Sequence, residues 1–223
     1  MVGSLAQSVS SLVDTSPQLG DALQSLGGEQ GVVDAYLSAM LGFIGFAVAA
    51  YAVQAVLRLY GEEVGQRAEP LLATPTGRIR WALGHLTISL LGTAVLLTAM
   101  GLAAGLAHGL RTGDIGGQLP RLLGASLVQV FAIWVIAAAV LALFGLAPRW
   151  APAGWGVVVV ALLLSLIGAL IKLNHWVMDL SPFTHLPKLP GGEVTWTPLI
   201  WLLAVTLGLG VVGLAALDRR DIG

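Results

Sequence analysis

The sequence contains no cysteine and few charged residues, and both absences limit what the protein can be. Without cysteine there are no disulfides, no thiolate metal ligands and no thiol nucleophile. Only 11 of the 223 residues are Lys or Arg and 12 are Asp or Glu, far below the usual quarter. The formal net charge of −1 lacks the basic excess of a nucleic-acid-binding protein, so we expect no nucleic-acid partner.

Charge is missing altogether from five long apolar stretches, at residues 35–57, 81–110, 122–148, 151–171 and 194–217. A helix needs about 20 apolar residues to cross the hydrocarbon core of a bilayer, and each stretch is long enough. Backbone in lipid must satisfy its own hydrogen bonds, which favours helices. The sequence therefore predicts an all-α fold: a polytopic transmembrane helix bundle with five spans plus short interfacial helices, and the lipid bilayer as its solvent.

Basic residues are distributed unevenly between the two sets of loops. One set carries seven Lys or Arg residues, the other carries four, and residues 1–34 carry none. Because basic residues concentrate in cytoplasmic loops, the N-terminus is expected outside and the C-terminus in the cytoplasm. The excess of Arg over Lys and the abundance of Ala, Gly, Leu and Val are typical of GC-rich bacteria, so we expect a multi-pass protein of the bacterial inner membrane. An outer N-terminus before an odd number of spans indicates that a preceding span is missing from this chain.

Residues 1–31 form the first of two predicted regions, an extracytoplasmic amphipathic segment. Leu5, Val9, Leu12 and Val13 share one helical face, and Ser16 followed by Pro17 is typical of the start of a second short helix. A packed cap on the bundle is favoured over a gate for substrate. Residues 32–223 form the second region, the transmembrane domain.

The cytoplasmic loop, residues 58–80, is the segment richest in charge. An apolar stripe at helical spacing predicts a short amphipathic helix there, and Glu63 precedes Arg67 by the four residues of a favourable intrahelical ion pair. Two interpretations stay open: a plain connector at the membrane interface, or a helix that docks on a cytoplasmic protein. The stripe consists of Val64, Ala68, Leu71 and Leu72.

The outer loop, residues 172–193, contains three prolines that prevent a long helix. Pro182, Phe183, His185 and Pro187 are expected to give it an ordered structural role on the bundle. His175, Asp179 and His185 match no strong metal-binding spacing, so we expect no metal there.

No acidic or basic residue interrupts a span, which disfavours a proton relay. The sequence also has no Walker A motif, serine nucleophile elbow or His-Glu-x-x-His motif, and we expect no catalytic residue and no enzyme. Gly101 and Gly105 would allow close helix approach. The polar residues within the spans either face a cavity or bond between helices; they are Gln54, Thr93, Ser126 and Gln129.

Three motifs resemble one known family. They are residues 58–81, with Glu62-Glu63, Arg67-Ala68-Glu69, Leu71-Leu72-Ala73-Thr74-Pro75 and Arg78-x-x-Trp81; Leu180-Ser-Pro-Phe-Thr-His-Leu-Pro187 followed by Leu189-Pro-Gly191; and Asp218-Arg-Arg-Asp-Ile-Gly223. In this order they are similar to the C-terminal half of bacterial ATP-binding-cassette permeases described as exporters of polyketide antibiotics. Such permeases have two six-span halves, and this chain resembles the second without its first span.

The resemblance implies a permease subunit or fragment that moves hydrophobic or amphipathic compounds, such as antibiotics, out of the cell. It implies that the loop is a coupling helix seated on a separate ATPase subunit, which would bind ATP and Mg²⁺, while this chain binds no cofactor. Another permease half, or a second copy, would complete the transporter. The alternatives are a membrane scaffold that recruits a cytoplasmic partner, and a secondary transporter. The docking residues so implied are Glu62, Glu63, Val64, Arg67, Glu69, Leu71 and Leu72.

Overall fold

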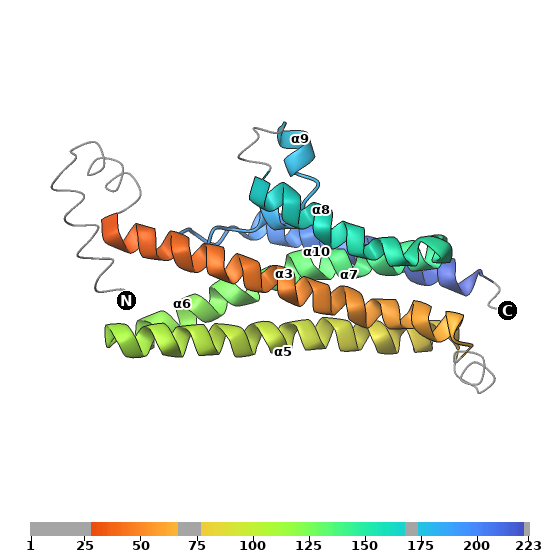
Figure 1. Ribbon diagram of the computed structural model, residues 1–223, viewed down its shortest axis with the longest axis horizontal. Helices are drawn as coiled ribbons and strands as arrows, with labels where there is room; N and C mark the ends of the chain where they lie inside the picture. Colours follow the sequence, from red (N-terminus) through yellow and green to blue (C-terminus); the bar gives the residue numbers. More distant parts are fainter. Residues whose placement is uncertain (1–27, 67–76, 168–173, 221–223) are drawn as a thin grey trace.

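The computed structural model describes residues 28–66, 77–167 and 174–220, and this part of the chain is helical (Figure 1). Its long helices are α3 (Gly28–Val64), α5 (Arg78–Thr112), α6 (Ile115–Leu127), α7 (Gln129–Leu146), α8 (Gly154–Ile167) and α10 (Trp196–Asp218). Three short elements, η1 (Pro148–Ala153), α9 (His175–Met178) and η2 (Pro182–His185), lie in the connections. Counting α6 with α7 and η1 with α8, five helical segments are long and apolar enough to cross a membrane, so the predicted all-α bundle of five spans is confirmed.

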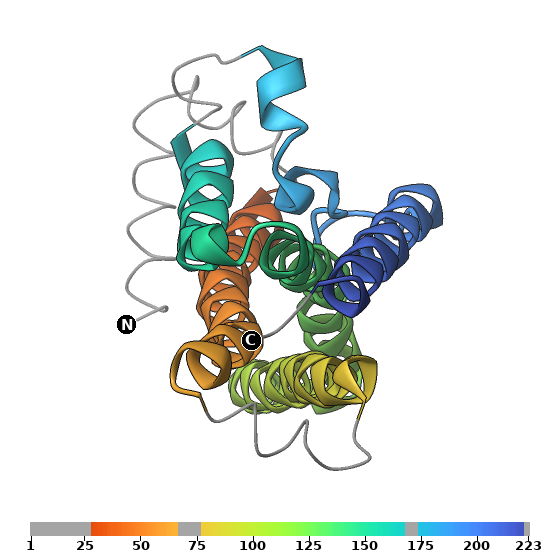
Figure 2. The same cartoon turned by 90° about the vertical axis from the view of Figure 1, so that its right-hand side faces the viewer.

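Helix α7 lies in the middle of the bundle, with α3, α5, α8 and α10 around it (Figure 2). Helix α7 has no charged residue on any face, which suits a helix surrounded by other helices. Its side chains Ile133, Ile136, Leu141 and Phe144 are fully buried and form much of the core. The helices around it bury one face each and expose the other, as expected for elements facing lipid.

The helices differ from the predicted spans mainly at their ends. Helix α3 begins at Gly28 and runs without a break to Val64, beyond both ends of the predicted span 35–57. Helix α5 begins at Arg78, so the connection is shorter than the predicted loop 58–80. Residues 28–31, predicted as the end of the outer segment, belong to α3. The two short helices predicted in that segment lie outside the described residues.

Helices α5 and α6 form a tight hairpin. Gly113 ends α5 with a left-handed backbone (φ 74°), and the Asp114 carboxylate accepts a hydrogen bond from the Gly117 amide to start α6. A Cβ at Gly101 would lie 2.9 Å from the Leu123 Cα, and one at Gly105 would lie 2.9 Å from the Leu119 Cα. The close approach predicted for these two glycines is therefore confirmed, with α6 as the neighbour.

Two of the four polar side chains singled out inside the spans bond between helices. Ser126 donates to the Leu97 carbonyl (2.7 Å), and Gln129 donates to the Leu41 carbonyl (2.7 Å). Thr93 donates instead to the Ser89 carbonyl on its own helix (2.7 Å). Of the four residues, Gln54 alone is exposed.

Candidate functional site

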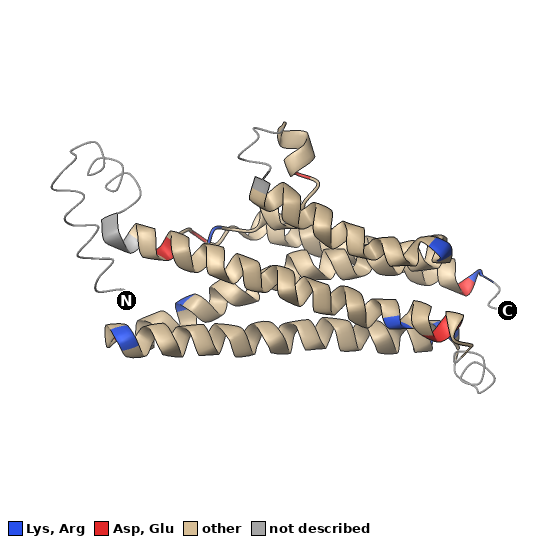
Figure 3. Cartoon of the chain, in the orientation of Figure 1, with Lys and Arg blue, Asp and Glu red and all other residues tan. Residues whose placement is uncertain are grey.

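On the long helices the charged residues lie near the two ends of the bundle and the middle carries no charge (Figure 3). The end at which α3 and α7 finish, α5 begins and α10 finishes is named the Arg220 end; the opposite end is the Asp34 end. Asp34 and Glu63, both on α3, are separated by 29 residues. At 1.5 Å per residue this is about 43 Å, the thickness of a bilayer including its headgroups. The two charged ends therefore match the two membrane surfaces.

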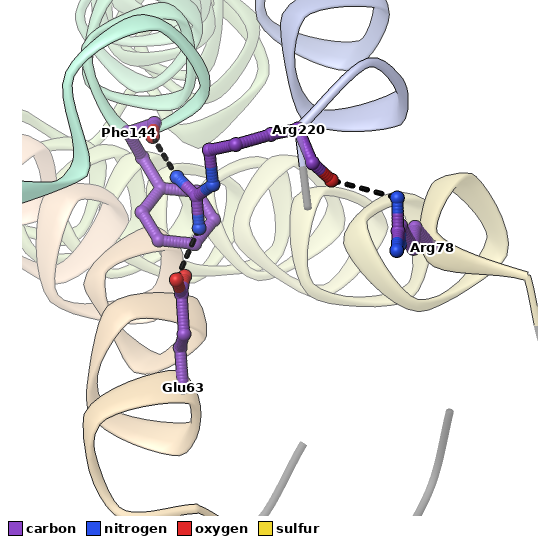
Figure 4. Close-up of polar contacts among 4 residues, drawn as sticks. All are labelled: Glu63, Arg78, Phe144 and Arg220. Carbon is purple, nitrogen blue, oxygen red and sulfur yellow. Dashed lines mark hydrogen bonds and ion pairs between the residues drawn. The ribbon is translucent and has the colours of Figure 1, made fainter. Parts of the chain in front are cut away.

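Arg220, just after the end of α10, joins three helices at the Arg220 end (Figure 4). Its guanidinium forms an ion pair with Glu63 at the end of α3 and donates to the Phe144 carbonyl of α7 (2.9 Å). The same group lies 5.1 Å from the centre of the Phe144 ring, a cation–π contact. Because only 18% of the Arg220 side chain and 22% of the Glu63 side chain are exposed, water screens this pair less than a surface ion pair.

Arg78, the first residue of α5, ties a fourth helix to the same cluster. It donates to the Arg220 carbonyl (2.7 Å) and, more weakly, to the Asp218 carbonyl (3.4 Å). The last carbonyls of a helix have no partner within the helix, and a cation there also complements the helix dipole. Arg78 thus stabilises the end of α10 and holds it beside α5.

Glu62 makes a second link between α3 and α5. Its carboxylate accepts a hydrogen bond from the Trp81 indole (2.8 Å) and lies 3.2 Å from Nε2 of His85. Trp81 is buried, and its ring meets that of His85 edge to face with centroids 6.0 Å apart. One carboxylate therefore fixes two rings from the first turns of α5.

The predicted docking residues divide into two groups. Glu62, Glu63 and Val64 lie in the last turn of α3, where Val64 is exposed and both carboxylates contact other helices of this chain. The expectation that these three belong to a separate short helix is wrong, because α3 continues through them. Among the described residues, the second oxygen of Glu63 has no hydrogen-bond partner. The remaining four, Arg67, Glu69, Leu71 and Leu72, lie outside the described residues.

The Asp34 end has an ion pair of its own. Arg121 on α6 pairs with the buried Asp34 on α3 and donates to the Pro190 carbonyl in the outer loop (3.2 Å). A Cβ at Gly191 would lie 3.3 Å from the Asp34 Cβ, so the loop passes directly over this carboxylate. Arg121 therefore joins α3, α6 and the outer loop.

The outer loop is folded against the bundle through η2. Phe183 packs on Phe46 of α3 with ring centroids 4.2 Å apart. Ser181 donates to the Ala161 carbonyl of α8 (3.2 Å), while His185 is exposed and its Nδ1 lies 3.3 Å from the Ser181 carbonyl. Pro182 begins η2 and the half-buried Pro187 follows it. In the described part of the chain, no three His, Asp or Glu side chains are close enough together to hold a metal ion.

Several residues of the Arg220 end and of the Asp34 end were not singled out as functional from the sequence. Asp34 and Arg121 each stand immediately before an apolar run, and Arg220 stands shortly after the last one. That position shows only that the residue ends a span. Their pairing depends on which helices lie together, and no local pattern contains that information.

Five apolar helical segments whose charged residues lie only near their ends define a multi-pass membrane protein. A family model described as "Multidrug efflux system permease Rv1217c, C-terminal domain" matches residues 1–217, and the chain belongs to this family. It is 40% identical over 222 residues to the multidrug efflux system permease protein Rv1217c of Mycobacterium tuberculosis (strain ATCC 25618 / H37Rv). The match covers the whole chain but 40% of that relative's length. The predicted resemblance to the C-terminal half of an exporter permease is thereby confirmed.

Proposed function

We propose that this chain is part of the permease of an efflux transporter and moves hydrophobic or amphipathic compounds outward across the bacterial inner membrane. The observation that carries the proposal is the 40% identity along the whole chain to a protein named as a multidrug efflux permease. In this proposal the chain forms part of the route that the compound takes across the membrane, and it catalyses no reaction.

The energy would come from ATP, with Mg²⁺, bound and hydrolysed in a separate subunit, and a further permease half or a second copy would complete the pathway. The subunit would dock at the Arg220 end, on the segment between α3 and α5, which the distribution of basic residues assigns to the cytoplasm. Glu62, Glu63, Arg78 and Arg220 tie the helices that flank this segment to one another and to α7 and α10. A force applied there would therefore reach four helices together.

Transport in inside-out vesicles from the source bacterium tests the proposal. Outward export becomes uptake in such vesicles, so a fluorescent lipophilic dye should accumulate when ATP is added and should not accumulate after the gene is deleted. Uptake that vanadate abolishes and a protonophore leaves unchanged is expected. Uptake that only the protonophore abolishes would identify a secondary transporter, and equal uptake with and without the gene would favour a scaffold.

The docking site is tested with Leu71 and Leu72, because Glu63 already pairs within this chain and its substitution would disturb the bundle as well. Leu71→Asp and Leu72→Asp should each reduce ATP-dependent uptake and recovery of the ATPase subunit. Leu180→Asp, a matched change at an exposed leucine of the outer loop, should leave both unchanged. If Leu180→Asp reduced subunit recovery as much as the other two, docking at the Arg220 end would be wrong.

A further inference from the structure

A groove between α3 and α5 on the outside of the bundle is not accounted for by the transport proposal. Its volume is about 200 Å³, below the roughly 300–1,000 Å³ of pockets that enclose a drug-sized molecule. A groove of this size holds only part of a ligand whose remainder lies outside. The lining residues are Tyr51, Gln54, Ala55 and Arg58 of α3 and His85 and Ile88 of α5.

The groove is polar at one end and apolar at the other. Arg58 and His85 lie toward the Arg220 end, and Tyr51 closes the deeper end, with its hydroxyl 3.5 Å from the Ile88 carbonyl. An added Cβ at Gly92 would lie 2.0 Å from that hydroxyl, so the phenol ring rests directly on the α5 backbone. Ala55 and Ile88 form the walls between the two ends.

The depth of the groove follows from its position along α3. Arg58 comes five residues before Glu63, about 8 Å from the end of the bundle, where the headgroups meet the hydrocarbon. Tyr51 lies seven residues earlier, about 10 Å deeper, within the hydrocarbon. The polar end of the groove is therefore at the height of lipid phosphates, and its apolar end is at the height of acyl chains.

The charge at the polar end favours an anion. Arg58 is exposed, and no carboxylate of the described residues pairs with it. The nearby acidic residue, Glu62, contacts Trp81 and His85, which leaves Arg58 as the group at this end that can bind an anion. A cation on an otherwise apolar surface at this height attracts an anionic headgroup.

We propose that this groove binds one anionic phospholipid, with the phosphate against Arg58 and the beginning of an acyl chain along Ala55, Ile88 and Tyr51. The ligand is a lipid of the leaflet at the Arg220 end and not a transported compound. The proposal does not depend on the transport activity.

Native mass spectrometry of the purified, delipidated chain tests it. The chain is mixed with equal amounts of phosphatidylglycerol and phosphatidylcholine of the same acyl chains. The preference is the ratio of the two lipids among chains that carry one bound lipid. Phosphatidylglycerol should be preferred, and Arg58→Gln should reduce the preference roughly five-fold, the factor that corresponds to about 1 kcal/mol per basic residue at an anionic surface. Arg149→Gln removes the same charge from an exposed arginine in η1, which follows α7 at the same end and lies outside the groove, and should leave the preference unchanged.

Two further measurements separate the groove from general surface charge. Gln54→Phe fills the groove from an exposed position without changing the charge, and it should weaken lipid binding while the melting temperature stays the same. Millimolar inorganic phosphate should not displace the bound phosphatidylglycerol. Equal losses in Arg58→Gln and Arg149→Gln, unchanged binding in Gln54→Phe, or displacement by phosphate alone would each overturn the proposal.

Discussion

Arg220 holds three helices together, so its loss should lower stability far more than the loss of its neighbour. Arg220→Met removes the ion pair to Glu63, the hydrogen bond to the Phe144 carbonyl and the cation–π contact at once. Hydrogen bonds to charged groups contribute about 1.5–3 kcal/mol, and losing one partner of a buried ion pair costs about 3–5 kcal/mol. Since both side chains retain some exposure, we expect the free energy of unfolding to fall by about 2–3 kcal/mol.

Glu63→Gln should have a smaller effect, about 1 kcal/mol, because the amide oxygen can still accept a hydrogen bond from Arg220 and the contacts with Phe144 stay. The two changes should not be additive. A double-mutant cycle should give a coupling energy of about 1 kcal/mol or more, as found for residues in direct contact. Arg219→Met is the matched control: Arg219 is exposed, and its substitution should change stability by less than about 0.5 kcal/mol.

The assay is unfolding in mixed micelles by a denaturing detergent, followed through the fluorescence of the seven tryptophans. Equal effects of Arg219→Met and Arg220→Met would refute the reasoning, since only Arg220 reaches Glu63 and Phe144. A coupling energy near zero would mean that the ion pair between Glu63 and Arg220 contributes nothing to the free energy of unfolding.

Three other predictions concern packing, topology and the outer loop. Gly105→Leu should destabilise the protein by about 1–3 kcal/mol through overpacking against the α6 backbone, whereas Gly84→Leu, where an added Cβ meets nothing within 4 Å, should not; the same unfolding assay measures both. An impermeant thiol reagent should label Gly116→Cys but not Arg80→Cys in intact cells, and the reverse pattern would invert the proposed topology. Arg121→Met frees the outer loop from α3 and α6, so protease should cleave the loop several times faster. An unchanged cleavage rate would show that the other contacts of the loop are enough to hold it on the bundle.

The number and position of the spans could be predicted because the bilayer imposes a local rule. An apolar run of about 20 residues is visible in the sequence without knowledge of its neighbours. The ends were less predictable, since a charged residue ends an apolar run without ending a helix. Arg58, Glu62 and Glu63 continue α3 because the headgroup region solvates charge and because other helices supply partners.

The contacts of the candidate site could be predicted far less well. Helical periodicity relates residues three or four apart, and it favoured Arg67 as the partner of Glu63. In the structure Glu63 pairs with Arg220, 157 residues away, and Glu62 bonds to Trp81, 19 residues away. Such pairings arise from the packing of whole helices, whereas the close approach at Gly101 and Gly105 needed only the absence of a side chain.

Helix α3 crosses the membrane as one continuous helix. No proline occurs between Gly28 and Val64, so the same helix carries the ion pair at Asp34 and the ion pair at Glu63. While the helix stays continuous, tilting or sliding displaces both of its ends together. A rearrangement that displaces α3 at one membrane face would therefore also displace its end at the other face.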